Sequence, residues 1–178
     1  DKHQVIVPRK GILELARLLT EQDGTVSIVL GQPHIRATTG EFTFTSKLVD
    51  GKFPDYERVL PRGGDKLVLA DRQGLREAFS RTAILSNEKY RGIRLQLASG
   101  QLKMQANNPE QEEAEEEVAV DYNGGSLEIG FNVSYLLDVL AVMTTDQVRL
   151  ILSDSNSSAL VQEAGNDESS YVVMPMRL

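Results

Sequence analysis

Apolar residues near the start of the chain follow first a strand pattern and then a helix pattern. A short apolar run at residues 5–7 precedes apolar residues at helical spacing, namely Ile12, Leu13, Leu15, Ala16, Leu18 and Leu19. Alternating runs follow at residues 25–30, 34–37 and 41–45, with glycine-containing turn signals between them. The pattern predicts one strand, one helix and three further strands, a βαβββ unit.

The same order of elements occurs twice more. The second unit begins with a strand at residues 67–69, continues with a helix over Leu75 to Ala83, and ends with strands near residues 93–97, 102–106 and 118–122. The third begins at residues 127–129, has a helix over Leu136 to Met143, and ends with strands at residues 148–152, 159–162 and 171–174. Starts at residues 5, 67 and 127 give a nearly constant period, which indicates a repeated structural module.

Two such units are expected to make one α+β domain, with antiparallel sheets covered on one face by helices. We therefore expect a complete domain over residues 61–178, built from units at about residues 65–123 and 124–178. Residues 1–60 are expected to hold half of another domain, whose second half precedes it, and a linker at residues 53–64 that is rich in proline and glycine.

Composition removes several classes of chemistry. The 178 residues include no cysteine, which excludes a disulfide framework, a thiolate zinc site and a cysteine nucleophile, and which fits a reducing cytoplasm. His3 and His34 are read as surface histidines, no phosphate-cradling glycine loop occurs, and no cofactor is expected. The sequence has neither a signal-peptide core nor an apolar run near the roughly 20 residues that cross a bilayer, so a soluble chain is expected.

Charge is concentrated in one place. The net charge of −7 argues against a simple basic nucleic-acid binder, but much of the excess lies between Glu110 and Glu117. The rest of the chain is nearly balanced and could present a basic face to DNA. The acidic run itself has three interpretations: a metal site, a solvated approach to a strand, or a docking surface for a basic partner. It lacks the spacing and the glycine of a calcium loop.

Six segments resemble the bacterial DNA polymerase III beta sliding clamp family. They are VPRKG at residues 7–11, FTSKLVDG at 44–51, FPDY at 53–56, LSNEKYRG at 85–92, NNPEQEEAEE at 107–116 and YVVMPMRL at 171–178. The resemblance implies the DNA-clamp fold: a head-to-tail homodimeric ring of six domains, with helices lining the hole and sheets outside. It also implies that this chain lacks the first domain and half of the second.

The resemblance implies a non-catalytic role in replication. The ring would encircle duplex DNA without reading its sequence and would dock peptides of polymerases, the clamp loader and repair proteins, with no membrane and no metal involved. The family pocket lies between the second and third domains and accepts a glutamine followed by apolar or aromatic residues. The matching positions are Pro54, Arg58, Val59, Tyr90, Asn132, Tyr135, Asn156, Ser158, Val172, Val173, Met174, Pro175, Met176, Arg177 and Leu178.

Two further sets of residues follow from the same resemblance. The interface between the two copies in the ring would use the apolar residues Ile84 and Leu85 and the acids Glu110, Glu112, Glu113, Glu115 and Glu116, which would face basic residues of the other copy. The DNA-facing candidates are Arg9, Lys10, Arg72, Arg76 and Arg81. Two alternatives stay open: a metal-dependent carboxylate enzyme that uses Glu112, Glu113 and Glu116, and a repeat-built structural protein that binds neither DNA nor peptides.

Overall fold

The computed structural model describes residues 3–20 and 24–177, apart from the side chain of Asp167. The chain divides into two compact units, Asp1–Asp55 and Tyr56–Leu178, which are described separately. The division falls inside the predicted linker, which also contains a short helix, α2 (Tyr56–Val59), that the sequence pattern did not reveal.

The N-terminal unit has one helix beside a three-stranded sheet. Helix α1 (Arg9–Thr20) is followed by β1 (Ser27–Leu30), β2 (His34–Thr39) and β3 (Phe42–Lys47), which pair antiparallel in the order β1-β2-β3. Helix α1 contacts β3 so closely that a Cβ on Gly11 would lie 2.9 Å from the Ser46 hydroxyl. The strand predicted at residues 5–7 is only a single bridge, in which Ile6 pairs with Val49.

The C-terminal unit contains two copies of the βαβββ pattern, as predicted. The first copy has β4 (Lys66–Asp71), α3 (Arg72–Thr82), the 3₁₀ turn η1 (Ala83–Leu85), β5 (Gly92–Ala98), β6 (Gln101–Asn107) and β7 (Glu113–Ala119). The second has β8 (Leu127–Asn132), α4 (Val133–Val142), β9 (Gln147–Leu152), β10 (Ala159–Glu163) and β11 (Asn166–Val173). The sequence pattern placed the strand that became β7 too late, at residues 118–122.

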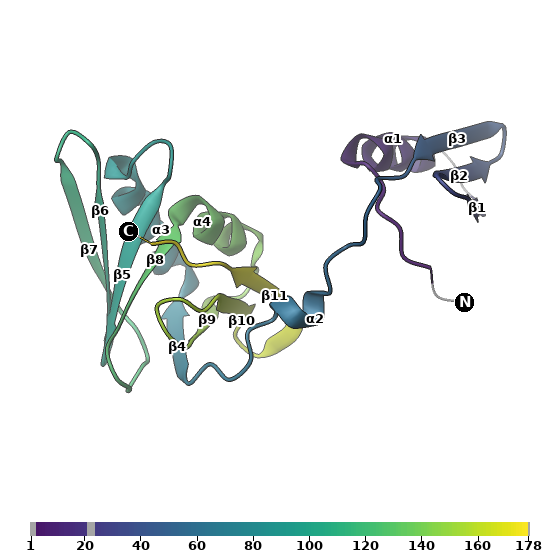
Figure 1. Cartoon of the computed structure of the whole chain (residues 1–178). Helices are drawn as coiled ribbons and strands as arrows, with labels where there is room; N and C mark the ends of the chain where they lie inside the picture. The colour runs from purple at the N-terminus through teal and green to yellow at the C-terminus, as the bar shows by residue number, and fades with distance from the viewer. Residues whose placement is uncertain (1–2, 21–23, 178) are drawn as a thin grey trace. The chain divides into compact units, whose positions relative to one another are not determined.

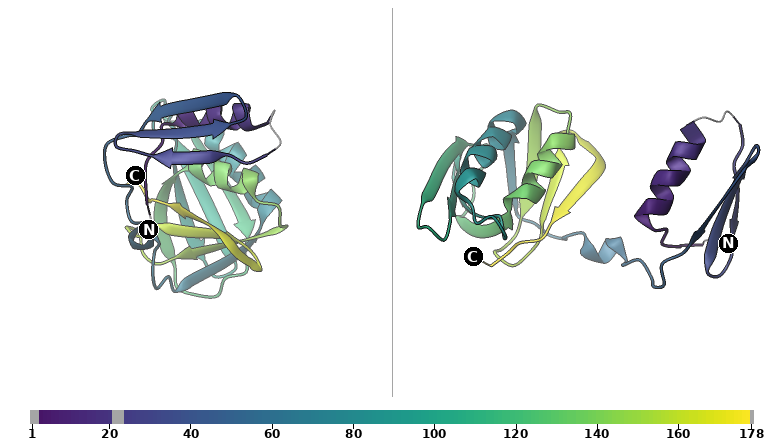
Figure 2. Two further views of the ribbon diagram at one scale, coloured as in Figure 1. Left: turned by 90° about the vertical axis from the view of Figure 1, so that its right-hand side faces the viewer. Right: turned by 90° about the horizontal axis from the view of Figure 1, so that it is seen from above.

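The two copies exchange their first strands. One sheet has the order β11-β10-β9-β4 and the other the order β7-β6-β5-β8, so that β4 and β8 each complete the sheet of the other copy. Helices α3 and α4 contact each other and cover the sheets (Figures 1 and 2). Each four-stranded sheet therefore contains strands from both copies, which joins the two copies into one compact unit.

The core of the C-terminal unit follows from the predicted periodicities. Strands β5 and β6 alternate buried and half-buried residues, and α3 buries Leu75, Ala78, Phe79 and Thr82. Phe79 and Phe131, which lie on α3 and on the exchanged strand β8, are among the largest fully buried side chains. Asn132 accepts a hydrogen bond from the Ser134 amide at 2.9 Å, which makes it the N-cap of α4.

Candidate functional site

The segment after β11 joins the two sheets of the C-terminal unit. We call residues 174–177 the tail segment. Strand β11 is an edge strand that ends at Val173, and the Met176 amide then donates to the Gly130 carbonyl of β8 at 2.8 Å. The tail segment therefore runs from one sheet to the other (Figure 1). Met174 lies between these two anchors and is 71% exposed.

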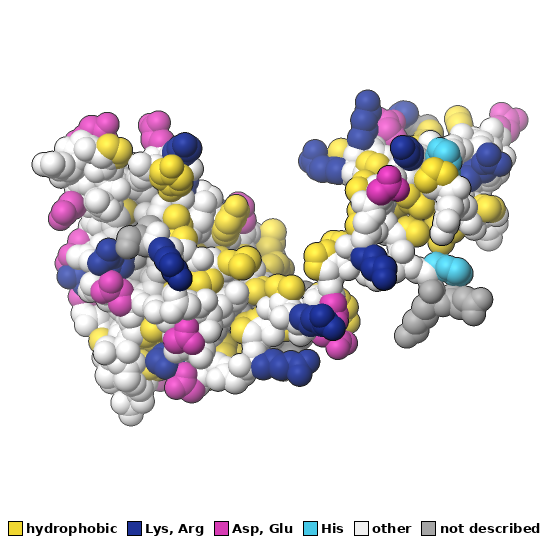
Figure 3. Space-filling model, in the orientation of Figure 1, with side chains coloured by type: hydrophobic (Ala, Val, Ile, Leu, Met, Phe, Trp, Pro, Cys, Tyr) yellow, Lys and Arg dark blue, Asp and Glu magenta, His cyan; other side chains and the backbone are white. Residues whose placement is uncertain are grey.

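Further segments of the predicted partner pocket lie around the start of α4. Tyr135 in the first turn of α4 is 59% exposed, whereas the Asn132 side chain is engaged as the helix cap. The Val133 amide donates to the Arg91 carbonyl at 2.8 Å and ties the loop that carries Tyr90 to the same helix start. Hydrophobic side chains gather over α4 and β11 (Figure 3). The exposed side chains of this region therefore project from backbone segments that hydrogen bonds hold in place.

Two hollows flank the tail segment. The first, which we call the Tyr90 hollow, is about 450 Å³ and is lined by Asn87, Tyr90, Gly92, Asn107, Asn108, Pro109, Met176 and Arg177. The second, the Asn156 hollow, is about 350 Å³ and is lined by Arg94, Glu128, Ile129, Gly130, Ser155, Asn156, Met176 and Arg177. The structure therefore puts Tyr90 and Asn156 beside the tail segment, in separate hollows.

The other predicted pocket residues are distributed as follows. Arg58 and Val59 belong to α2, Ser158 directly precedes β10, Val172 is half-buried in β11, and Pro175 lies in the tail segment. Pro54 belongs to the N-terminal unit, and Leu178 lies outside the described residues. Val173 is 4% exposed and packs in the core, so its side chain is removed from the exposed wall. Strand alternation explains this, since β11 presents neighbouring residues to opposite faces.

The predicted interface acids lie along a free strand edge and in the turn before it. Strand β7 is the outer strand of its sheet. The acidic run extends into this strand, whereas the sequence pattern placed the strand after the run. Glu115 accepts from Lys103 Nζ and from Gln105 Nε2, both at 2.8 Å, on the neighbouring strand β6. These donors, Lys103 first, lower the pKa of Glu115 below its ordinary value. Lys103 and Gln105 are two positions apart and so lie on the same face of β6, and this alternation is the sequence signal that could have identified them as partners of Glu115.

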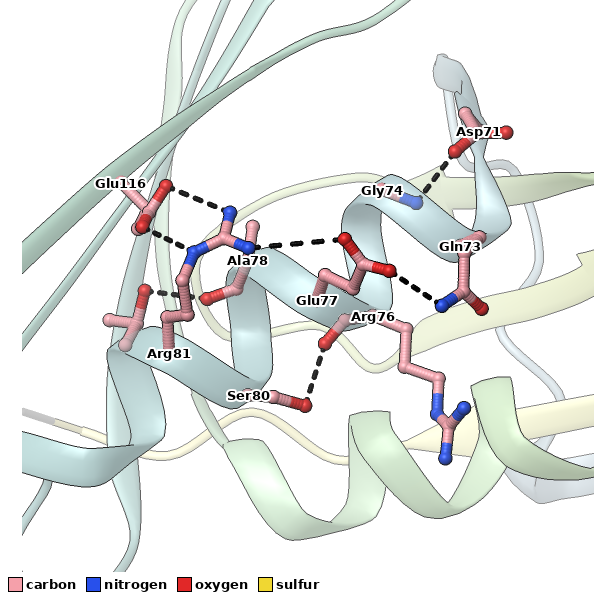
Figure 4. Close-up of polar contacts among 10 residues, drawn as sticks. Asp71, Gln73, Gly74, Arg76, Glu77, Ala78, Ser80, Arg81 and Glu116 are labelled. Atoms are coloured by element: carbon pink, nitrogen blue, oxygen red, sulfur yellow. Dashed lines mark hydrogen bonds and ion pairs between the residues drawn. The ribbon is translucent and has the colours of Figure 1, made fainter.

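Glu116 points to the opposite face, where its partner is Arg81 of α3. Arg81 Nε donates to Glu116 Oε1 at 2.6 Å and its terminal nitrogen to Glu116 Oε2 at 3.2 Å, while Glu77 lies 4.0 Å away on the same helix (Figure 4). The Arg81 hydrogen bond lowers the pKa of Glu116. The pair joins a residue predicted to face DNA to one predicted to face a second copy of the protein, and it fastens α3 to the edge strand.

The turn before β7 is closed by its own side chains. Asn108 Nδ2 donates to Glu112 Oε2 at 2.7 Å, and the Glu112 amide donates back to Asn108 Oδ1 at 2.9 Å. Gln111 has a φ of 66°, the left-handed conformation of a tight turn, and Glu110 is exposed beside it. Glu113 begins β7 on the same face as Glu115.

The predicted apolar contacts adjoin this edge. Ile84 and Leu85 belong to η1, which contacts β6 and β7. Ile84 is 75% exposed and Leu85 is half-buried. The structure therefore brings together an exposed apolar residue, an unpaired strand edge and a row of acids, which the sequence places more than twenty positions apart.

The geometry does not support the carboxylate-enzyme alternative. Glu112 is held by Asn108 in the turn, Glu113 lies on the outer face of β7, and Glu116 lies on the helix-facing side in a bidentate pair with Arg81. Carboxylates that diverge in this way cannot share a metal ion. Within residues 3–20 and 24–177, no group of three or more His, Cys, Asp or Glu side chains is placed to hold one.

The predicted DNA-facing residues differ in whether their charged groups have hydrogen-bond or ion-pair partners within the fold. Arg72 donates to the Thr145 carbonyl at 2.6 Å and to the Leu140 carbonyl at 3.3 Å, so it caps the end of α4, and Arg81 pairs with Glu116. Arg76 is exposed and extends away from that network (Figure 4), and within the described part of the chain its guanidinium makes no hydrogen bond or ion pair. Arg9 and Lys10 are exposed at the start of α1.

Comparison with known proteins gives matches along the chain. The family model for the C-terminal domain of the DNA polymerase III beta subunit matches residues 57–177, and the model for its central domain matches residues 1–55. The beta sliding clamp of Pseudomonas putida is 89% identical over 178 residues, and that of Escherichia coli K12 is 56% identical over 176 residues. The chain spans 48% of the length of each of these two relatives.

Solved structures give the same result. A crystal structure of the DNA polymerase sliding clamp from Pseudomonas aeruginosa with ligand is 87% identical, has a TM-score of 0.88, and is matched over 100% of this chain and 49% of its own. A crystal structure of the Caulobacter crescentus beta sliding clamp with bound PEG is 39% identical, has a TM-score of 0.85, and is matched over 98% of this chain and 46% of its own. No helix among the described residues is long and apolar enough to cross a membrane.

Proposed function

The chain belongs to the DNA polymerase III beta subunit family, and we propose that it forms part of a non-catalytic, cytoplasmic sliding clamp. In this proposal the complete protein encircles duplex DNA as a homodimeric ring, confers processivity on the replicative polymerase, and docks peptides of its partners. The observation that carries the proposal for this chain is the tail segment, whose exposed Met174 is held between anchors on two sheets.

We assign residues 61–178 to a complete clamp domain and residues 1–60 to half of the middle domain plus the linker. The strand exchange in the C-terminal unit supports this assignment, because two βαβββ copies are needed to complete its sheets. The N-terminal unit has one helix and a three-stranded sheet, and the outer strand β1 exposes Ile28 and Val29 by 57% and 59%. An apolar edge of this kind fits a surface that another half-domain covers.

The docking surface would be the exposed part of the tail segment together with the start of α4. Methionine adapts its shape to varied apolar side chains, and tyrosine is frequent at positions that dominate binding energy. Met174 and Tyr135 meet this description and are both more than half exposed. We propose that they receive the apolar or aromatic residues of a partner peptide.

Contact between the two copies in the ring and contact with DNA are assigned to separate surfaces. The apolar residues of η1 and the acids along β7 would meet basic residues of a second copy, where charges select the partner and apolar burial supplies most of the affinity. The basic residues at the helices would attract phosphates without base contacts, because tight binding would prevent sliding. Arg76 is the best-placed candidate on α3, since Arg72 and Arg81 are engaged within the fold.

The docking proposal is tested in a full-length clamp protein that carries this sequence as its C-terminal half. A labelled peptide with a glutamine followed by apolar residues is titrated by fluorescence anisotropy against the parent protein and against Met174→Ala and Tyr135→Ala. Each substitution is expected to weaken binding by about tenfold or more, the effect of losing a dominant contact. Val142→Ala, which alters a 61% exposed residue at the other end of α4, serves as the control and should leave affinity unchanged. Unchanged binding by both test variants contradicts the proposal.

A further inference from the structure

The Tyr90 hollow adjoins Met174 and Tyr135, the two residues proposed to receive the apolar part of a peptide, only through the tail segment, and neither of them lines it. Its wall shares Met176 and Arg177 with the tail segment, whose Met174 is assigned to the docking surface. Tyr90 also belongs to the predicted pocket, whereas the rest of the wall comes from residues that the predicted pocket does not include, namely Asn87, Gly92, Asn107, Asn108 and Pro109. All of them belong to the C-terminal unit, so the hollow is complete within one compact domain.

The wall on the Tyr90 side is held in place by its own hydrogen bonds. Asn87 Oδ1 accepts from the amides of Lys89 and Tyr90, both at 3.0 Å, and the Asn87 carbonyl accepts from the Arg91 amide at 2.7 Å. Arg91 adopts a φ of 50° and donates from its guanidinium to the Ala83 carbonyl at 3.0 Å. This loop therefore needs little ordering when a ligand binds, which lowers the entropic cost of binding.

The opposite wall is equally fixed. Asn108 is locked to Glu112 by two hydrogen bonds, and Pro109 follows it in the turn. The Met176 amide is bound to Gly130, which fixes the tail segment on the third side. The hollow is thus an open depression bordered by three segments that are each held by hydrogen bonds.

The chemistry of the hollow favours a negatively charged group. No acidic side chain is among its lining residues, whereas Arg177 and the amide of Asn107 are exposed donors. Lys89 does not line the hollow, but its positively charged Nζ lies 5.2 Å from the centre of the Tyr90 ring, which does. Within residues 3–20 and 24–177, neither Arg177 nor Lys89 forms an ion pair. The apolar surfaces of Tyr90, Met176 and Pro109 match the methylene groups of a glutamate.

We propose that the Tyr90 hollow binds an acidic side chain of the partner, located in the segment that flanks the docked peptide. This inference rests on the proposed docking function and extends it with a charge preference. Met174 and Arg177 are three positions apart, and three extended residues span about 10 Å. The acidic residue should therefore lie within about three positions of the apolar residues that the docking surface receives.

The test compares two peptides that differ at one flanking position, glutamate in one and glutamine in the other, with amidated C-termini and the full-length protein. Each of the three flanking positions on either side is examined in turn. At low salt, one position should show a preference for glutamate of about fivefold, the upper range for an exposed ion pair. The preference should fall as salt rises, because exposed charges are screened.

Protein variants locate the preference. Arg177→Gln should abolish it, and Lys89→Gln should reduce it while leaving the glutamine peptide bound as before. Arg94→Gln is the matched control, because Arg94 lines the Asn156 hollow and is paired with Glu128 at 3.1 Å. A preference that survives Arg177→Gln, or that Arg94→Gln abolishes, overturns the assignment of the hollow.

The outcomes separate this inference from the proposed function. If both peptides bind equally and Met174→Ala weakens both, the docking function stands and the acidic preference is refuted. If neither peptide binds, or Met174→Ala has no effect on either, the docking function fails and the inference fails with it. A third peptide carries glutamine at the flanking position and a free C-terminal carboxylate. If only this peptide gains affinity, the hollow binds a chain end, and the assignment to an acidic side chain is wrong.

Discussion

Both compact units contain a helix followed by three antiparallel strands, yet the apolar residues of these elements are buried to different degrees in the two units. Strand β5, which follows α3 in the C-terminal unit, is paired on both sides and exposes Ile93, Leu95 and Leu97 by no more than 2%. Strand β1, which follows α1 in the N-terminal unit, is paired on one side only and exposes Ile28 and Val29 by more than half. One repeat unit of this kind therefore does not bury its own apolar residues completely. A second copy is needed to cover them, as the C-terminal unit shows.

The helices differ in the same way. Helix α3 exposes Leu75 and Phe79 by 2% and 1%, because α4 and the sheets cover it. Helix α1 exposes Ile12 and Leu13 by 49% and 54%. At about 25 cal/mol per Å² of apolar surface, covering such residues is the main source of stability, so the C-terminal unit should be the more stable of the two.

Truncation of a large core residue should show the greatest difference between the units. Phe131→Ala removes a fully buried ring from the exchanged strand β8 and is expected to lower the free energy of unfolding of the C-terminal unit by about 3–5 kcal/mol. Ile28→Ala, on the exposed edge of the N-terminal unit, should change stability by about 0.5 kcal/mol or less in this chain. Urea unfolding followed by circular dichroism gives both values. Similar losses at the two positions would contradict the comparison.

Acid should weaken the C-terminal unit through Glu163. Its carboxylate accepts from the Thr144 amide and hydroxyl and from Asn166, and it thereby joins the segment after α4 to β10. The Thr144 amide is the largest of the causes that lower the pKa of Glu163 below 4.5. Because the folded pKa is depressed, this stabilisation is complete above pH 4.5 and is lost as the pH falls through the folded value.

The corresponding measurement is the melting temperature between pH 7 and pH 3 for the parent chain and for Glu163→Gln. The variant should melt lower at neutral pH and should lose less stability on acidification. Glu88→Gln, at an exposed loop position, is the control and should follow the parent curve. Parallel curves for the parent and Glu163→Gln would show that this carboxylate does not couple folding to pH.

The smallest effect is expected for the pair that fastens α3 to the free edge of β7. Arg81→Ala and Glu116→Gln should each lower the stability only slightly, because the Arg81 side chain is 53% exposed and solvent screens the interaction. A double-mutant cycle should give a small coupling energy that declines in high salt. A coupling energy several times larger would mean that solvent does not screen the pair, and that it holds β7 to α3 much more strongly than an exposed ion pair would.

The helices and strands were largely predictable, because the residues that each element buries recur at the spacing of a helix or of a strand. Helices α1, α3 and α4 and most strands occur where the apolar spacing placed them. Pairing was not predictable, because the order of elements does not say which sheet a strand joins, and the exchange of β4 and β8 depends on the tertiary packing. Strand β7 was misplaced because an edge strand alternates charged with half-buried residues and lacks a strong apolar signal.

The candidate site was predictable in part for a related reason. The exposed residues of the tail segment follow from the family resemblance, but side-chain contacts between distant positions leave no periodic trace. Arg81 and Glu116 are 35 positions apart and were assigned to different surfaces. Val173 was assigned to the pocket by position, although strand alternation turns it into the core.

The anchoring of the tail segment would link the proposed docking to the completion of folding. Met174 is held on one side by β11 and on the other by the hydrogen bond from Met176 to β8, and these strands belong to different sheets. A chain in which only one sheet has formed lacks one of the two anchors and cannot fix the methionine in place. A partner that docked here as proposed would therefore meet Met174 in its fixed place only on chains in which both sheets have formed.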